Sequence, residues 1–166
     1  MEERITQDTF RSILDGEKIS YDWFEHAPAF TCADLRDVGL PSTAKGVKNL
    51  FLYDSNKGKY FLVLVGEDRN VDLKALGKHL GVRLSFVSAE KMQTLLGVQP
   101  GSVTVFALLN DSEKTVQLVA DRVLWEECEQ LQFHPMVNTA SVVIARTDVE
   151  RLLARSGHTA QVIDVP

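Results

Sequence analysis

The sequence predicts a mixed α/β fold (α+β, with helices and strands interleaved) in a single domain spanning residues 1–166. Segments with helical and with β periodicity alternate along the chain, and two pairs of β segments are separated by short turns. Short turns favour antiparallel pairing and helical crossovers favour parallel pairing, so we expect a mixed sheet. The 166 residues, 45% of them hydrophobic, suffice for one compact core.

Residues 45–65 predict the centre of the sheet. Two apolar, aromatic-rich runs at 50–53 and 60–65 flank a polar break that contains Asn56, Lys57 and Gly58. Turn residues between two β-prone runs are typical of a hairpin. The second run, YFLVLV, is apolar at almost every position, so it predicts a strand that is covered on both faces.

The N-terminal part predicts two helices separated by a strand. Apolar residues at i, i+3 and i+4 indicate a helix over 7–15 that ends at Gly16, and alternation over 19–24 indicates a strand. Thr31 and Asp34 are typical of an N-cap and its reciprocal partner, and they predict a second helix that continues to about Val38.

The middle of the chain predicts two capped helices around a short strand at 83–87. Asp72 caps the first helix, which runs to Leu80 before Gly81. Ser88 opens the second helix and Gly97 closes it. Met92 lies on the apolar face of this second helix, and we assign it to the core.

A second hairpin is expected after this helix. The sequence VQPGS at 98–102 predicts a turn because of its Pro-Gly pair. The apolar, β-rich run 103–109 predicts a strand, the polar residues 110–114 turn the chain back, and 115–120 predicts the returning strand.

The C-terminal part predicts a strand, a helix and a last strand. Residues 124–130 fit either a helical turn or a short bent strand, and 131–138 should be irregular because Pro135 cannot occupy a central strand position. Residues 141–145 predict a strand, 147–156 a helix, and 161–165 a final short strand.

The composition argues against several classes of function. A formal net charge of −5 does not suit a protein that coats nucleic acid, so a nucleic-acid substrate would need a local basic patch. The candidates for such a patch are Lys45, Lys48, Lys57, Lys59, Lys74, Lys78, His79 and Arg83. The chain lacks the run of about 18 apolar residues that a membrane span needs, and its polar start is unlike a secretory signal. We therefore expect no membrane partner and a cytoplasmic location.

Cysteine and histidine do not show metal-ligand spacing. Cys32 and Cys128 lie far apart and form no CxxC pair, which indicates reduced thiols and no metal. Cys32 fits two interpretations, a structural residue and a nucleophile at a helix start. The four histidines are scattered, and we expect His79 and His158 to face solvent.

Four polar features lie at the ends of predicted β segments, where a pocket can form between loops. They are Lys48-Asn49, the Gly101-Ser102 turn, His134, and Asn138-Thr139. The sequence contains no pattern of a nucleophile with its base. An enzyme built on these features would act by positioning and by stabilising an oxyanion with backbone N–H groups and a lysine. Lys48 also fits an ordinary surface lysine, and His134 a hydrogen-bonded structural histidine.

A string of motifs extends this interpretation. The segments are KNLFL at 48–52, KGKYFLVLV at 57–65, VDLKALGKHLG at 71–81, LSF at 84–86, LLGVQPGSVTVFALLND at 95–111 and FHPMVNTAS at 133–141. In this order the chain closely resembles the YbaK/EbsC superfamily. Within it, the chain is most similar to freestanding prolyl-tRNA editing proteins and to the editing insertion of bacterial prolyl-tRNA synthetases.

The resemblance implies a curved mixed sheet flanked by helices and an aminoacyl-tRNA deacylase that removes alanine wrongly attached to proline tRNA. It implies no metal and no organic cofactor. On the family's pattern Lys48 contacts the substrate near the ester and the terminal adenosine, Gly101 opens a GxxxP loop whose N–H groups hold the scissile carbonyl and water, and His134 limits the size of the side chain. The expected substrate-binding residues are Asn49, Ser102, Val103, Asn138 and Thr139.

One position departs from the family's pattern. The loop reads GSVTV where the pattern has GSVTP, so Val105 restores a backbone donor and loosens the turn. Three hypotheses therefore stay open: a deacylase for Ala-tRNA(Pro), a related deacylase for Cys-, Ser- or Thr-charged tRNA, and an inactive module that binds tRNA or a synthetase. The expected partner is the acceptor end of tRNA(Pro), delivered by prolyl-tRNA synthetase or an elongation factor.

Overall fold

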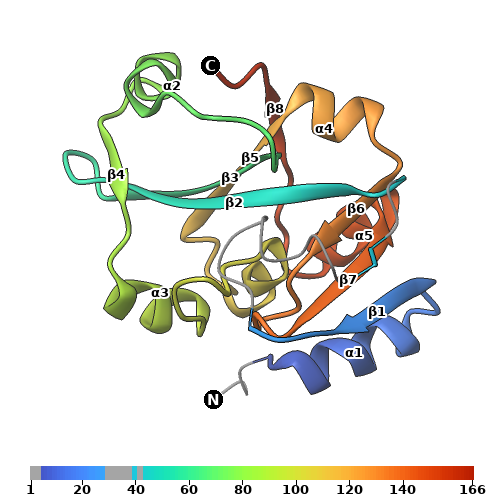
Figure 1. The fold of residues 1–166 in the computed structure, drawn as a ribbon. Helices are drawn as coiled ribbons and strands as arrows, with labels where there is room; N and C mark the ends of the chain where they lie inside the picture. Colours follow the sequence, from blue (N-terminus) through green and yellow to red (C-terminus); the bar gives the residue numbers. More distant parts are fainter. Residues whose placement is uncertain (1–4, 29–38, 41–42) are drawn as a thin grey trace.

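One mixed sheet of eight strands organises the computed structural model, which describes residues 5–28, 39–40 and 43–166 (Figure 1). The strand order is β1-β7-β6-β2-β3-β5-β8, and β4 pairs with β2 outside this path. The strands are β1 (Tyr21–Glu25), β2 (Lys45–Asp54), β3 (Lys59–Gly66), β4 (Leu84–Phe86), β5 (Val116–Asp121), β6 (Gln130–Phe133), β7 (Ala140–Ala145) and β8 (Gln161–Ile163). The pairs β2–β6, β3–β5 and β5–β8 are parallel and the other pairs are antiparallel, which confirms the predicted mixed sheet.

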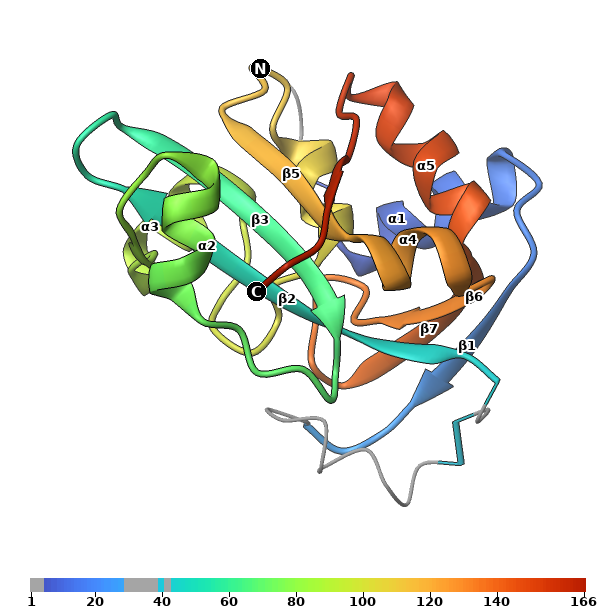
Figure 2. The same cartoon turned by 90° about the horizontal axis from the view of Figure 1, so that it is seen from above.

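The helices lie in two groups along the sheet. They are α1 (Gln7–Gly16), α2 (Leu73–Leu80), α3 (Ala89–Leu96), the 3-10 helix η2 (Val105–Asn110), α4 (Arg122–Glu127) and α5 (Arg146–Arg155). Figures 1 and 2 show α2 and α3 towards one end of the molecule, and α1, α4 and α5 towards the other. No helix in the described part of the chain has the length and apolarity needed to cross a membrane.

The hairpin of β2 and β3 forms the centre of the sheet, as the sequence predicts. Along β3, Leu62 and Leu64 belong to the main core, whereas Phe61, Val63 and Val65 belong to a second apolar cluster on the opposite face. All five side chains are at most 3% exposed. Burial on both faces explains why this run is apolar without alternation.

Side-chain caps set the start of the two helices in the middle of the chain. Asp72 accepts a hydrogen bond from the N–H of Ala75 at 3.1 Å, and Ser88 accepts one from the N–H of Lys91 at 3.2 Å. These contacts satisfy a donor that a helix start would otherwise leave free. The predicted bounds of α2 and α3 are confirmed.

The predicted second hairpin is wrong. Residues 105–110 form the 3-10 helix η2 and not a strand, and β5 pairs in parallel with β3. Val105, Phe106, Ala107 and Leu108 are all fully buried, so an uninterrupted apolar run reflects complete burial here and does not reveal the backbone geometry. The 3-10 helix is the last part of the long connection, through α2, β4 and α3, that brings β5 into the sheet parallel to β3.

The C-terminal prediction of a strand, a helix and a last strand is confirmed, but the prediction that residues 131–138 are irregular is wrong for residues 131–133. The segment after β5 is the helix α4, and residues 130–133 pair as β6 with β7, so the irregular stretch begins only at His134. Pro135 follows the strand and takes no place in its ladder. The predicted helix from Thr31 to Val38, with Cys32, lies outside the described residues.

The expectation for His158 is also wrong. His79 is exposed as predicted, but His158 is only 7% exposed and its Nε2 lies 2.9 Å from Oδ2 of Asp111. The position of His158 after a helix and near the end of the chain suggested a surface residue. Its buried carboxylate partner, 47 residues earlier in the sequence, could not be inferred from local pattern.

Candidate functional site

The site is built on a gap in one edge of β2. On that edge β6 pairs with residues 45–46 and β4 pairs with residues 52–54, while β3 covers the other edge throughout residues 47–54. In the described part of the chain, residues 47–51 therefore have no strand beside them on this edge. The backbone groups that point that way remain accessible to another partner.

The register shows which backbone groups face the gap. The carbonyl of Gly46 accepts a hydrogen bond from the N–H of Glu67, so the backbone groups of even-numbered β2 residues point towards β3. Because these groups alternate along an antiparallel strand, those of odd-numbered residues point to the opposite edge. The carbonyl of Val47 accepts from Nδ2 of Asn49 at 3.3 Å, and that of Phe51 accepts from the N–H of Val87 at 3.1 Å. The N–H and C=O of Asn49 are the groups that this pattern leaves for a ligand.

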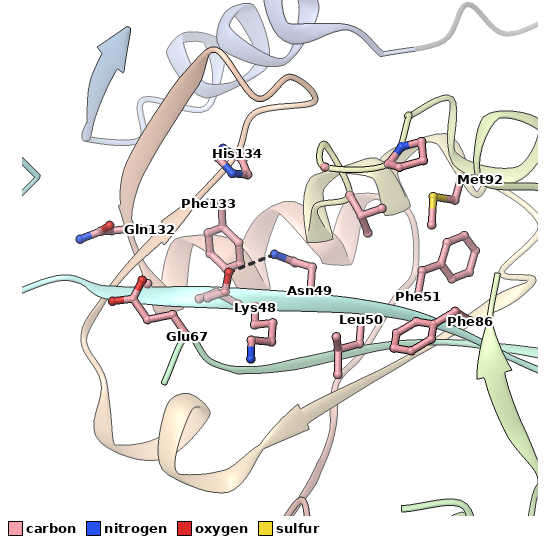
Figure 3. Close-up of a pocket in the computed structure, with 15 residues that line it drawn as sticks. Lys48, Asn49, Leu50, Phe51, Glu67, Phe86, Met92, Gln132, Phe133 and His134 are labelled. Carbon is pink, nitrogen blue, oxygen red and sulfur yellow. Dashed lines mark hydrogen bonds between the residues drawn. The ribbon is translucent and has the colours of Figure 1, made fainter. Parts of the chain in front are cut away.

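A cavity of about 540 Å³ opens along this gap. Figure 3 shows Glu67 and Gln132 at one end of it, Phe51, Phe86 and Met92 at the other, and Asn49, Phe133 and His134 between them. Its walls come from β2, from the loop at 100–103 and from the end of β6. The cavity thus joins segments that lie far apart in the sequence.

Five of the residues singled out in the sequence line this one cavity. They are Lys48, Asn49, Gly101, Val103 and His134. Ser102 is buried beside it and is not among its lining residues. Asn138 is half-buried and Thr139 exposed, and neither lines the cavity, although the carbonyl of Thr139 accepts from the N–H of His26 at 2.9 Å.

Lys48 borders the cavity, but its ammonium is turned away from His134. Figure 3 places the Lys48 nitrogen on the side of β2 opposite to Asn49, as the alternation of a strand requires. There Nζ donates to the carbonyl of Arg69 at 2.5 Å. The positive charge therefore lies on the far side of β2 from Asn49 and His134, where a backbone oxygen binds it.

Asn49 fixes the loop to the strand. Its Oδ1 accepts from the N–H of Val105 at 3.1 Å, while its Nδ2 donates to Val47 of its own strand. The bond to Val105 uses a donor that proline, the residue of the family's pattern, would not have. The departure at position 105 thus has a definite structural use.

The Pro100-Gly101 turn presents backbone donors to the cavity. The N–H of Ser102 donates to the carbonyl of Gln99 at 3.0 Å, and Gly101 has a φ of 87°, which together define a type II turn. This bond consumes the N–H of Ser102. The N–H groups of Gly101 and Val103, two cavity-lining residues, have no hydrogen-bond partner among the described residues.

His134 offers a neutral imidazole. Its Nδ1 lies 3.0 Å from the carbonyl of Ala140, which can only accept, so Nδ1 carries the proton and Nε2 is an acceptor. Burial lowers the pKa of His134 below its usual 6.5, and the neighbouring His26 lowers it further, against the smaller opposing effect of the Ala140 hydrogen bond. The ring centroids of His26 and His134 are 6.3 Å apart.

The sequence analysis missed several cavity residues. Glu67 follows the last residue of β3, and Gln132 lies within β6. Phe86 ends the short strand β4, and Phe133 precedes His134. Met92 was assigned to the core; it packs partly against the core and also lines the cavity. Phe133 lies beside a residue already chosen, but no local signal marks Glu67 or Phe86.

The arrangement suits hydrolysis of an ester that is already activated. No serine, threonine, cysteine or aspartate is among the described residues that line the cavity, and the ionisable side chains there are Lys48, Glu67 and His134. The simplest chemistry for this set is a positioned water assisted by hydrogen-bond donors. The fold and the site together are compatible with a hydrolase that uses a positioned water.

Comparisons with known proteins show the family of the chain. The model of the aminoacyl-tRNA editing domain matches residues 26–152, and the chain belongs to that family of YbaK-like editing domains. The chain is 33% identical over 154 residues to the prolyl-tRNA editing protein ProX of Acetoanaerobium sticklandii, covering 92% of this chain and 93% of that protein. The recognition made from the motifs is confirmed, and the enzyme class, aminoacyl-tRNA deacylase, agrees with it.

Two further similarities bear on fold and substrate. The chain is 22% identical over 151 residues to the multifunctional Ser/Thr-tRNA deacylase ProXp-y of Escherichia coli K12, covering 89% of this chain and 88% of that protein. A crystal structure of a candidate trans-editing enzyme for prolyl tRNA synthetase superposes with a TM-score of 0.71 at 18% identity, covering 99% of this chain and 98% of that one. The structural likeness confirms the fold.

Proposed function

We propose that this protein hydrolyses alanine from mischarged tRNA(Pro) in the cytoplasm, as an editing enzyme that acts in trans. One observation carries the proposal: Asn49, Gly101, Val103 and His134 line a single cavity at the unpaired edge of β2. The similarity to a prolyl-tRNA editing protein along nearly the whole chain supports the choice of substrate.

The reaction needs one water and no covalent intermediate. The water oxygen attacks the ester carbonyl carbon, the bond from that carbon to the ribose oxygen breaks, and a proton from the water ends on the ribose oxygen. The products are free alanine and a tRNA with both terminal hydroxyl groups restored. The neighbouring ribose hydroxyl helps to orient the water.

The N–H groups of Gly101 and Val103 stabilise the negative charge that develops on the carbonyl oxygen. Both residues line the cavity, and preorganised backbone donors of this kind are worth about 10²–10³-fold in rate for each donor. Lys48 would add positive charge from the other side of β2. Its contact with the ester or a phosphate requires that its ammonium exchange the Arg69 carbonyl for the substrate.

Selection in this proposal is by size. The rings of Phe133 and His134 lie together in the middle of the cavity, where they limit the room for an amino-acid side chain (Figure 3). A wall can exclude a proline ring outright, whereas apolar contacts discriminate by only about 1–3 kcal/mol per methylene. Correctly charged Pro-tRNA(Pro) should therefore survive.

The test is a panel of charged tRNAs incubated with the purified protein. We expect rapid release of alanine from Ala-tRNA(Pro) and an intact ester on Pro-tRNA(Pro). An Ala-tRNA(Pro) ester that persists with excess protein would contradict the proposal. Binding of charged tRNA without deacylation of any member would favour the inactive module.

A second candidate substrate is a serine or threonine ester. The similarity to the Ser/Thr-tRNA deacylase of Escherichia coli favours it. Val105 favours it too, because it replaces the proline of the family's pattern just after the loop that lines the cavity. Faster hydrolysis of Ser- or Thr-charged tRNA than of Ala-tRNA(Pro) in the same panel would select this alternative. A Cys-charged tRNA completes the panel.

The protein itself should bind the acceptor end, and a synthetase or elongation factor should deliver the charged tRNA. The net charge of −5 supports delivery by another protein, because it disfavours a broad tRNA-binding surface on this one. Addition of prolyl-tRNA synthetase to the deacylation reaction should then raise the rate at limiting tRNA.

A further inference from the structure

We propose that the cavity fixes the direction in which the terminal aminoacyl-adenosine lies, with the base against Phe86 and the α-ammonium group against Glu67. This inference rests on the proposed function and deepens it. Two independent observations at opposite ends of the cavity carry it.

The first observation is an exposed aromatic ring. Phe86 is 63% exposed, and the only other large hydrophobic residue exposed to a similar degree among the described residues is Val123, at 53%. Pairing of Phe86 with Leu52 fixes β4 against β2, so the ring stands on a sheet and not on a loose loop. Exposed aromatic rings at such sites are the usual stacking surface for unpaired bases.

The surroundings of Phe86 suit a base. Leu50, Phe51 and Met92 line the same end of the cavity and carry no charge (Figure 3). A purine has two apolar faces and would cover this surface, whereas a charged group there would lose water without gaining a partner. The apolar end of the cavity therefore fits the adenine.

The second observation is a carboxylate at the other end. Glu67 lines the cavity and lies directly over Gly46, where a Cβ atom would be only 2.0 Å from Oε2 of Glu67. Gly46 thus provides the room that lets this carboxylate fold over the strand. Any side chain at position 46 would displace it.

No cation neutralises Glu67 within the described part of the chain. Lys45 pairs instead with Asp68 at 2.9 Å, and Lys48 binds the Arg69 carbonyl. Glu67 is exposed to solvent where it lines the cavity, and an unpaired carboxylate there attracts a positively charged group. The α-ammonium is the cationic group of an aminoacyl ester. The end of the cavity near Glu67 therefore fits the amino acid.

The spacing along β2 agrees with this direction. Gly46 lies under Glu67, and Leu52 pairs with Phe86. Six residues of strand span about 20 Å, which leaves room for a ribose ester between a base at one end and an amino group at the other. Phe86, opposite Leu52, lies on the Lys48 side of β2, whereas Asn49 and His134 lie on the other side. The ester bond would therefore lie at the open edge of β2, where the cavity joins the two faces of the strand.

The experiment measures affinity for a stable analogue of Ala-tRNA(Pro), in which an amide joins alanine to the terminal adenosine. Wild-type protein should bind this analogue about 10-fold or more tightly than the same analogue with an acetylated amino group, which has no charge. Glu67→Gln should abolish this preference. The matched control is Asp68→Asn, the adjacent carboxylate that pairs with Lys45, and it should keep the preference.

The base is tested with the same analogue. Phe86→Ala should lower the affinity for the analogue about 10-fold, whereas Phe86→Trp should keep the affinity of wild type. Phe86→Leu should bind as weakly as Phe86→Ala, because it keeps the apolar bulk without the ring. Val123→Ala, on the surface of α4, should leave the affinity unchanged.

The outcomes separate this inference from the proposed function. An acetylated analogue that wild type binds as tightly as the free amine, or Phe86→Leu binding as well as Phe86→Trp, would overturn the inference even if the ester is hydrolysed. The expected affinities together with an ester that stays intact would support the inference and overturn the proposed function.

Discussion

Lys48 provides the sharpest test of the proposed catalysis, because its ammonium binds the Arg69 carbonyl and does not point into the cavity. Lys48→Met keeps the aliphatic stem and removes the charge, so it should lower kcat/KM for Ala-tRNA(Pro) by about 10²-fold. Lys45→Met, which removes an ammonium paired with Asp68, should change kcat/KM by less than about 3-fold.

Deacylation kinetics of the two variants show whether the positive charge of Lys48 contributes to the reaction. Equal rates for Lys48→Met and wild type would mean that the charge at position 48 has no part in the reaction. Thermal unfolding of both variants is the control for a structural effect, since the Lys48 ammonium also ties β2 to the segment after β3.

At the scale of single residues, the sequence is a good guide to which residues gather and a poor guide to their orientation. Gly101, Val103 and His134 reach the cavity from a turn or just after a strand, whereas Lys48 and Asn49 lie in the middle of β2, where its edge is unpaired. The direction of the Lys48 side chain depends on strand alternation and on a carbonyl 21 residues away. Glu67 and Phe86 carried no signal because their roles arise only when β3 and β4 pair with β2.

At the scale of elements, the junction between β2 and η2 depends on one side chain. The N–H of Val105 is buried, and Oδ1 of Asn49 is its acceptor. Asn49→Ala should lower the free energy of unfolding by about 1–3 kcal/mol because it leaves that donor without a partner. In a Val105→Pro background, where the donor is absent, the same substitution should cost less.

A double-mutant cycle by urea denaturation measures this coupling. An Asn49→Ala cost that is the same in both backgrounds would show that the hydrogen bond contributes nothing. As a control, Leu50→Val should lower the free energy of unfolding equally in both backgrounds. It leaves the hydrogen bond intact, because Leu50 packs against the second apolar cluster.

The errors in the predicted elements have one physical origin. The run 103–109 is apolar throughout, and such a run indicates burial without distinguishing a strand from a 3-10 helix. The capped helices α2 and α3 were predictable because Asp72 and Ser88 act on their own neighbours in sequence. Parallel pairing of β5 with β3 depends on contacts more than 50 residues apart, for example Tyr60 with Val116, which no local pattern records.

At the scale of the whole molecule, a buried carboxylate joins the loop before β5 to the end of α5. Asp111 accepts from the N–H groups of Thr115 and Val116 at 3.0 and 2.8 Å and contacts Nε2 of His158. Burial alone would raise the pKa of Asp111, but the His158 hydrogen bond and the two backbone donors outweigh it and hold the pKa below the usual 3.8.

This linkage predicts acid sensitivity. A carboxyl group whose pKa is lower in the folded state stabilises the fold fully above its unfolded pKa, and that stabilisation is lost as pH falls through the folded pKa. Asp111→Asn should therefore lower the free energy of unfolding at pH 7 by about 1–3 kcal/mol and make it less dependent on pH below about 4. Urea denaturation at several pH values measures both effects; Asp164→Asn, at a carboxylate that is 81% exposed, should show neither.

The whole molecule also sets the strength of tRNA binding. With a net charge of −5, we expect weak affinity that depends on the few lysines near the β2–β3 hairpin. If two phosphates are contacted, affinity should fall about 10-fold between about 50 and 200 mM salt. Filter binding of uncharged tRNA(Pro) at several salt concentrations measures the slope, and an affinity that does not change would exclude phosphate contacts.

The gap in the edge of β2 has a consequence for self-association. An open strand edge is ordinarily a template on which a second molecule can add a strand and begin to aggregate. Here β6 and β4 close the edge on either side, so the unpaired stretch, residues 47–51, is short. An unpaired edge of that length can accommodate the nucleotide of the proposed substrate. It offers too few backbone hydrogen bonds to bind a strand of a second molecule stably.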